Sequence, residues 1–238
     1  MSIVTVALAQ VPQTNDIEKN LGGILSAFTR LPKKTDLVCF PETALTGETT
    51  NAPSRYHEAI SRETKKRGIW CLYGAYVTTE DDQIFNQAIL LDRQGEVAYT
   101  YEKKHLWLAE PAIRSQDKNR VIATDFGKIG IIICWDIAFP EESRRLAKEG
   151  AQIIFCPSYW YKKLQTTKVI EALPQVRAFE NQIFFAFCDA YAPETAARSR
   201  ICSPIEVVAA AGVREEALVA RINLDEIESY RQTFDCWR

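Results

Sequence analysis

The chain has 238 residues, of which 47% are hydrophobic and 25% are charged, and its formal net charge is −2. This length suits one large α/β domain over 1–238, and the apolar content is enough for a sizeable core. A near-neutral surface of mixed charge gives no reason to expect nucleic acid or an anionic membrane as a partner. No stretch reaches the roughly 18 uncharged apolar residues that a membrane-spanning helix requires.

The apolar N-terminus lacks the basic residues that begin a secretory signal, so we expect a cytoplasmic protein with reduced cysteines. No two cysteines are spaced as Cys-x-x-Cys, and only two histidines are present. We therefore expect no zinc site. The seven cysteines are Cys39, Cys71, Cys134, Cys156, Cys188, Cys202 and Cys236.

Strand and helix patterns alternate along the chain. Apolar residues at helical spacing or helix-stop residues predict helices over 16–31, 61–68, 140–150 and 166–182, the last with a kink at Pro174. Short apolar, β-branched or alternating runs predict strands at 3–10, 35–42, 69–77, 85–92, 96–103, 120–127, 128–134, 151–157, 183–190 and 216–224. Two of these strands, 35–42 and 151–157, carry a proline at or near the end, which suggests two similar halves.

Three chemically active residues fall at the ends of predicted strands. Glu42 follows one strand, Lys103 another, and Cys134 ends the isoleucine-rich run 128–134. Ligands bind at the carboxyl ends of strands in open α/β sheets. If these strands are neighbours in one sheet, a carboxylate, an ammonium and a thiol converge at its edge.

Such a trio suits nucleophilic catalysis. The thiolate is the nucleophile, and a desolvated carboxylate can take the thiol proton as a general base. A buried lysine counters the negative charge that develops on the substrate, and the backbone N–H of Trp135 supplies a second donor. Attack on an amide or nitrile carbon then gives a covalent intermediate that water hydrolyses.

The segments "FPETALTGE", "YEKKHLW" and "IGIIICWDIAFPE" resemble, in order, the three signature segments of the nitrilase superfamily, the carbon–nitrogen hydrolases. "RAFENQ" resembles a further family segment. This resemblance implies an α/β fold, a four-layer α-β-β-α sandwich of two related halves. It also implies that Glu42 is the general base, Lys103 the catalytic lysine and Cys134 the nucleophile. Glu110 resembles the second glutamate of the family, which positions the lysine and the substrate.

The resemblance implies cofactor-free hydrolysis of a small amide or N-carbamoyl compound through an acyl-cysteine intermediate. Asp136 stands where family nitrilases tend to carry glutamate, which favours amides over nitriles. Nitrile hydrolysis and acyl transfer at the same site remain open, as do a catalytically silent binding scaffold and a thiol redox sensor. Trp107, Tyr159 and Trp160 are candidates for substrate binding, and family members usually form homodimers or larger homo-oligomers.

Simpler structural roles compete for each of these residues. Free cysteines are often small core residues, and we interpret Cys39, Cys71, Cys188 and Cys202 in this way. Lys104 is expected in solvent. A Cys–His mechanism through His105 is the less favoured alternative, and Asp136 is expected to bond the turn after Cys134 or to open the next helix.

Overall fold

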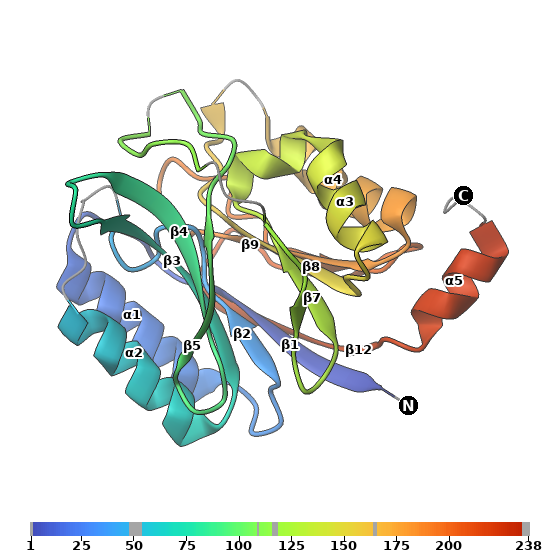
Figure 1. Ribbon diagram of the computed structural model, residues 1–238, viewed down its shortest axis with the longest axis horizontal. Helices are drawn as coiled ribbons and strands as arrows, with labels where there is room; N and C mark the ends of the chain where they lie inside the picture. The colour runs from blue at the N-terminus through green and yellow to red at the C-terminus, as the bar shows by residue number, and fades with distance from the viewer. Residues whose placement is uncertain (1, 48–53, 109, 116–118, 164–165, 235–238) are drawn as a thin grey trace.

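Two six-stranded sheets pack against each other in the computed structural model, with helices on both outer faces (Figure 1). The structure describes residues 2–47, 54–108, 110–115, 119–163 and 166–234, and Cys236 lies outside these ranges. The layers run helix, sheet, sheet, helix. The predicted four-layer α-β-β-α sandwich is therefore confirmed.

The first sheet has the strand order β12-β1-β2-β3-β4-β5. Strands β1, β2 and β3 are parallel, and the other neighbours pair in antiparallel fashion. Its strands are β1 (Ile3–Gln10), β2 (Leu37–Cys39), β3 (Trp70–Thr78), β4 (Ile84–Leu91), β5 (Val97–Glu102) and β12 (Glu216–Asn223).

The second sheet has the order β11-β10-β9-β8-β7-β6 and repeats this plan. Strands β7, β8 and β9 are parallel, and β6, β10 and β11 are antiparallel to their neighbours. Its strands are β6 (Ile122–Ala123), β7 (Lys128–Ile131), β8 (Ile153–Ser158), β9 (Phe184–Asp189), β10 (Arg200–Cys202) and β11 (Val207–Ala210).

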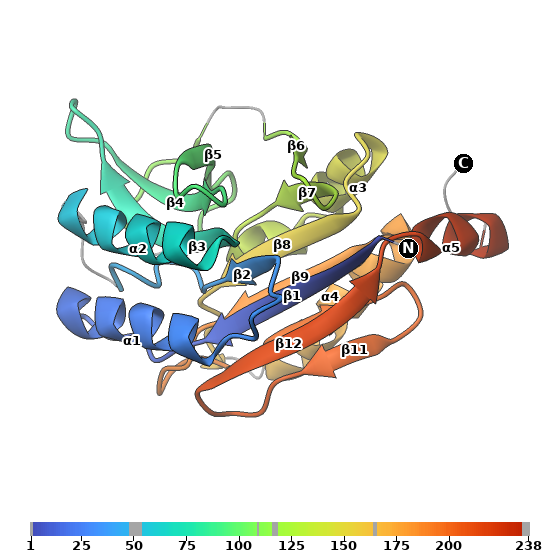
Figure 2. The same ribbon diagram turned by 90° about the horizontal axis from the view of Figure 1, so that it is seen from below.

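The helices show that the two halves are related. The unit β1-α1-β2-α2-β3 in the first half corresponds to β7-α3-β8-α4-β9 in the second, and each helix makes a crossover between parallel strands. Figure 2 shows α1 and α2 together on the outer side of the first sheet. The helices are α1 (Ile17–Arg30), α2 (Ser54–Arg67), α3 (Pro140–Lys148), α4 (Thr167–Asn181), α5 (Glu226–Phe234) and a short 3₁₀ helix η1 (Cys134–Ala138).

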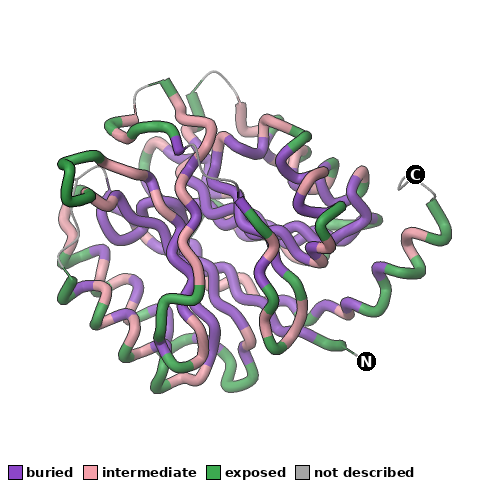
Figure 3. The backbone as a smooth tube through the Cα atoms, viewed as in Figure 1, coloured by how far each residue is buried: buried purple, intermediate pink, exposed green. Residues whose placement is uncertain are grey.

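The buried residues form two apolar clusters that hold these layers together. One cluster joins α1 and α2 to the first sheet, and the larger one fills the space around the second sheet and reaches the first. In Figure 3 the buried trace follows the central strands, whereas exposed positions gather on helices and turns. Parallel strands covered on both faces explain the continuous apolar runs of the sequence.

Individual residues explain where several elements begin and end. Asp16 caps α1 by accepting hydrogen bonds from the backbone N–H groups of Glu18 and Lys19. Gly68 follows α2 with φ +62°, a conformation in which glycine avoids steric strain. Helix α4 continues through Pro174.

Some elements differ from the sequence-based expectation. Strand β7 ends at Ile131, so the predicted strand 128–134 is too long, and β6 is only two residues long. Strands β10 and β11 and helix α5 were not predicted. They are short or expose most side chains, so they lack the apolar periodicity on which such predictions rest. None of the described helices is long and apolar enough to cross a membrane.

Candidate active site

Glu42 lies in a tight turn just after β2 and is 4% exposed. Its Oε1 accepts hydrogen bonds from Lys103 Nζ and Asn86 Nδ2, both at 2.7 Å, and its Oε2 accepts one from Tyr159 N at 2.8 Å. The turn packs directly on β3, where a Cβ at Gly74 would lie 2.4 Å from Thr43 N. Glycine at this position therefore allows the turn to hold the Glu42 carboxylate in place.

Lys103 follows β5 and is 1% exposed. Its ammonium donates to Glu42 Oε1 at 2.7 Å and to Glu110 Oε1. Burial by itself would lower the pKa of Lys103, but the nearby Glu42, Cys134 and Glu110 raise it well above its ordinary value. The ammonium is thus kept charged between two carboxylates.

Glu110 closes the other side of the lysine. Its Oε1 accepts a hydrogen bond from Trp107 N at 2.8 Å, and its Oε2 accepts one from Asn86 Nδ2 at 2.8 Å. Burial and the charge of Glu42 raise the pKa of Glu110, despite the opposing effect of Lys103.

Asn86 is a site residue that the sequence reasoning missed. It lies in β4, is 1% exposed, and donates to both Glu42 and Glu110. The only available signal was a polar residue in a largely apolar strand, which does not indicate what the side chain contacts. Asn86 holds the two carboxylates together around the lysine.

Cys134 is the first residue of η1, three positions beyond the end of β7, and it is 6% exposed. Its φ of +42° lies in the left-handed region, which is unfavourable for a residue with a side chain. The thiol lies 3.9 Å from Tyr159 O. Burial and Glu42 raise the pKa of the thiol well above its ordinary value, while Lys103 and the Ser158 hydroxyl lower it. The thiol is therefore protonated at rest.

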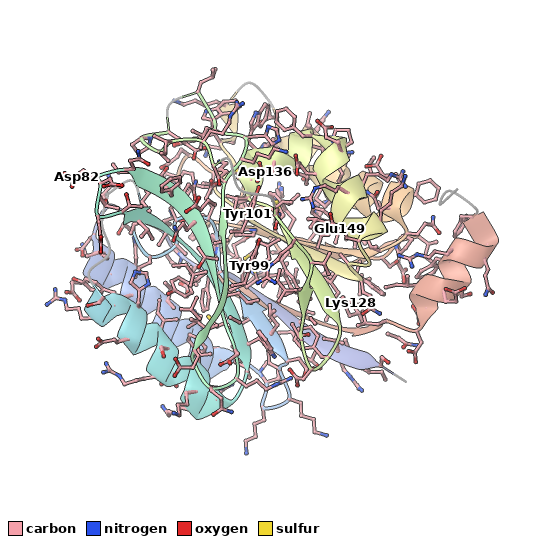
Figure 4. The ribbon with its side chains drawn as sticks, in the orientation of Figure 1. Asp82, Tyr99, Tyr101, Lys128, Asp136 and Glu149 are labelled. Atoms are coloured by element: carbon pink, nitrogen blue, oxygen red, sulfur yellow. The ribbon has the colours of Figure 1, made fainter. Side chains whose placement is uncertain are left out.

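Asp136 anchors the turn that carries Cys134. Its Oδ2 accepts hydrogen bonds from Ile133 N and the Tyr101 hydroxyl, and its Oδ1 accepts one from His105 N. Figure 4 shows Tyr101, which lies in β5, close to Asp136 in the turn after β7. Burial raises the pKa of Asp136 to about 6. The expectation that Asp136 bonds this turn is confirmed.

Aromatic side chains surround the turn. Trp135 packs edge-on against Trp107, with ring centroids 4.6 Å apart, and its ring centroid lies 5.7 Å from that of Trp160. The backbone N–H of Trp135 donates no hydrogen bond to any residue of the described ranges. Trp160 is 5% exposed, so most of its side chain is packed inside the protein, and its Nε1 donates to Thr166 Oγ1.

The trio converges, but not at the edge of one sheet as expected. Glu42 and Lys103 follow β2 and β5 of the first sheet, which are separated by β3 and β4, whereas Cys134 follows β7 of the second. The two sheets are linked at this site by Tyr159, which follows β8, donates its N–H to Glu42 and places its carbonyl near the Cys134 thiol. Periodicity gives neither strand order nor the assignment of strands to sheets, which is why this part of the prediction was wrong.

The neighbouring candidates face elsewhere. Lys104 is half exposed and pairs with Glu142 at 2.5 Å. His105 lies 3.3 Å from the same carboxylate and stacks on Phe139, with ring centroids 3.6 Å apart. Within the described ranges, no three His, Cys, Asp or Glu side chains form a group that could hold a metal ion.

The comparison with known proteins agrees with this geometry. The family model "Carbon-nitrogen hydrolase" matches residues 5–232. The "Hydrolase in pqqF 5'region" of Pseudomonas protegens is 31% identical, over 93% of this chain and 79% of that protein. The 2-oxoglutaramate amidase of Bacillus subtilis is 28% identical, over 84% of this chain and 83% of that protein. The crystal structure of Saccharomyces cerevisiae Nit3, a member of branch 10 of the nitrilase superfamily, matches with a TM-score of 0.89 at 26% identity, covering 98% of this chain and 94% of that one.

Fold and family match together define a hydrolase of the nitrilase superfamily. The chain belongs to the carbon–nitrogen hydrolase family, and it is an enzyme that acts on carbon–nitrogen bonds. The family resemblance predicted from the sequence is therefore confirmed.

Proposed function

We propose that this enzyme hydrolyses a small amide or N-carbamoyl compound through an acyl-cysteine intermediate, with Cys134 as the nucleophile. The observation that carries the proposal is the buried ammonium of Lys103, held between Glu42 and Glu110 and close enough to Cys134 to change the pKa of its thiol. The amidase named among the relatives supports an amide as the substrate.

In the first half-reaction, Glu42 takes the thiol proton while Cys134 Sγ attacks the carbonyl carbon. Because the thiol is protonated at rest, this proton transfer has to accompany attack. Lys103 Nζ and the Trp135 N–H stabilise the negative charge on the substrate oxygen. The C–N bond then breaks, and ammonia or an amine leaves with the proton from Glu42.

In the second half-reaction, water hydrolyses the thioester. Glu42 removes a proton from the water as it attacks the acyl carbon, and the resulting tetrahedral oxyanion uses the same two donors. The C–S bond breaks, the carboxylic acid leaves, and Cys134 recovers its proton. No cofactor is needed to balance either step.

Glu110 acts in this proposal as a positioning residue. It keeps Lys103 charged and aimed at the substrate oxygen, with Asn86 fixing both carboxylates. Trp107, Tyr159 and Trp160 shape the substrate pocket around the turn at Cys134, since two of them pack on Trp135 and the third contacts the thiol through its carbonyl.

The function is tested by measuring ammonia release from a panel of small amides, N-carbamoyl compounds and nitriles. We expect release from an amide or carbamoyl compound, and loss of release in Cys134→Ala. Cys71→Ala, which removes another fully buried thiol in the core between the first sheet and its helices, is the matched control and retains activity. Release from nitriles alone, or full activity of Cys134→Ala, would contradict the proposal.

We further propose, by analogy with the family, that the chain forms a homodimer or larger homo-oligomer. Helix α4 exposes Val169, Val176 and Phe179, whose spacing places them on one side of the helix. Light scattering after size-exclusion chromatography tests this, and a monomer at micromolar concentration would contradict it.

A further inference from the structure

A small cavity adjoins the proposed site. It has a volume of about 100 Å³, roughly that of three water molecules. It is lined by Gln13, Thr14, Asn15, Gly47, Tyr159 and Glu194. This space suits one small polar group, such as the end of a short substrate.

Gln13 presents an acceptor without a donor. It is 6% exposed, and its Nε2 donates to Thr43 O at 3.0 Å and to Thr43 Oγ1 at 2.7 Å. Because a carbonyl oxygen only accepts, these bonds fix the orientation of the side-chain amide. Its Oε1 is buried and has no hydrogen-bond partner among the described residues. Such an orphaned acceptor is costly unless a ligand or an ordered water molecule donates to it.

Glu194 supplies the charge of the cavity. One carboxylate oxygen, Oε1, accepts a hydrogen bond from the Tyr159 hydroxyl. Among the described residues, none of the ion pairs includes Glu194, although Lys162 donates its backbone N–H to Glu194 O. Gln13, with an unpaired amide oxygen, and Glu194, with a carboxylate that has no cation partner among the described residues, therefore line the same cavity.

Both walls of the cavity are attached to the proposed catalytic residues. Gln13 holds Thr43, the residue after Glu42. Tyr159 donates its N–H to Glu42 and places its carbonyl 3.9 Å from Cys134 Sγ, while its hydroxyl reaches Glu194. Tyr159 thus lines the cavity and also contacts the nucleophile through its backbone carbonyl. To occupy the cavity, a substrate that acylates Cys134 has to extend past Tyr159.

We propose that this cavity binds the cationic end of the substrate, so that the enzyme prefers amides whose far end carries an ammonium or guanidinium group. The inference rests on the amide hydrolysis proposed above and names its substrate class. It also separates this chain from its 2-oxoglutaramate amidase relative, whose named substrate carries a carboxylate that Glu194 would repel.

Matched amides of equal length test the preference: 5-aminopentanamide, the neutral hexanamide and the anionic adipic acid monoamide, with shorter and longer homologues of each. We expect kcat/KM for the best amino compound to exceed that of its neutral analogue by about tenfold or more, as a charge-assisted hydrogen bond provides. The anionic analogue should be the poorest substrate. Equal or better turnover of the neutral or anionic series would overturn the inference and leave amide hydrolysis intact.

Glu194→Gln tests the carboxylate itself, because it keeps an acceptor for Tyr159 and removes only the charge. The ratio of kcat/KM for the amino compound to that for the neutral compound should fall roughly tenfold to a hundredfold. Glu228→Gln on the exposed face of α5 makes the same charge change far from the cavity and should leave this ratio unchanged. An unchanged ratio in Glu194→Gln would refute the role of this carboxylate.

A binding measurement keeps the two proposals distinguishable if no amide is turned over. Calorimetry on Cys134→Ala should show that 5-aminopentanamide binds about tenfold or more tightly than hexanamide, and that Glu194→Gln in that background removes the difference. Absence of turnover with this binding preference would refute the hydrolysis but support the cavity's specificity. Equal binding of the two amides would refute the cavity's specificity.

Discussion

Lys103 Nζ lies 2.7 Å from Glu42 Oε1, and the two side chains are only 1% and 5% exposed. A buried ion pair is costly to desolvate, so it is weak evidence for stability on its own. Here the lysine has a second carboxylate partner, Glu110, and the pKa of the nearby Cys134 responds to the same charges. The arrangement therefore supports the catalytic role proposed above for Lys103, Glu42 and Glu110.

Lys103→Met should remove activity and weaken the fold. Loss of the cation leaves Glu42 and Glu110 buried together, and we expect the free energy of unfolding to fall by about 3–5 kcal/mol. Loss of an oxyanion donor should reduce kcat/KM roughly a hundredfold or more. Ammonia release and urea unfolding measure both effects. Lys104→Met is the control, because Lys104 is half exposed. This substitution should lower the free energy of unfolding by about 1 kcal/mol or less and leave the activity unchanged.

Asn86→Asp should impair catalysis by adding a third negative charge. The new carboxylate would lie against Glu42 and Glu110, and its charge would raise the pKa of Glu110 further above its ordinary value. Because Glu110 positions Lys103 in the proposed mechanism, the acidic limb of the kcat/KM profile should move to higher pH. The exposed Gln83→Glu provides the same change from amide to carboxylate without this shift. An unmoved profile in an active, folded Asn86→Asp would contradict the role given to Asn86.

Gly74→Ala should displace the turn that holds Glu42. The added Cβ would lie 2.4 Å from Thr43 N and 2.8 Å from Glu42 Cα, so backbone must move. We expect kcat/KM to drop at least about tenfold, since small misplacements of reacting groups are costly. Gly22→Ala on α1 meets no atom within 4 Å and should stabilise the protein by about 0.5–1 kcal/mol with normal activity. Normal activity in Gly74→Ala would show that the turn tolerates the shift.

Asp189 should make stability depend on pH. Burial raises its pKa from 3.8 to about 7, so between about pH 4 and 7 the folded protein binds one proton more than the unfolded chain. Its contribution to stability is therefore present at low pH and is lost as pH rises, by up to about 1.4 kcal/mol per pH unit. Urea unfolding at a series of pH values between about 4 and 7 measures this. As pH rises, the free energy of unfolding of Asp189→Asn should increase relative to that of the wild type by about that slope. Parallel profiles would contradict the raised pKa.

The three site segments could be predicted because their chemistry is local. Glu42, Lys103 and Cys134 each lie where a strand gives way to a turn, and the residues around each match one family. The geometry of the turn at Cys134 could not be predicted, because its left-handed φ depends on Asp136 accepting bonds from three separate backbone and side-chain groups.

What the sequence could not provide was the contact between distant segments. Asn86 lies in an ordinary apolar strand, and its role depends on β4 lying between β3 and β5. Gln13 and Glu194 are far apart in sequence and line one cavity only because the first and second sheets pack together. Strands β10 and β11 were missed for a related reason, since their pairing partners, not their own patterns, make them strands.

The central claim is that Cys134 carries the acyl group, and mass spectrometry of the acid-quenched enzyme tests it most directly. After reaction with an amide that the enzyme hydrolyses, peptide mapping should find the mass of the acyl group on Cys134, bound as a hydroxylamine-sensitive thioester. The adduct should be absent from Cys134→Ala and present in Cys71→Ala. An acyl group on a different cysteine, or ammonia release by Cys134→Ala at the wild-type rate, would contradict the account.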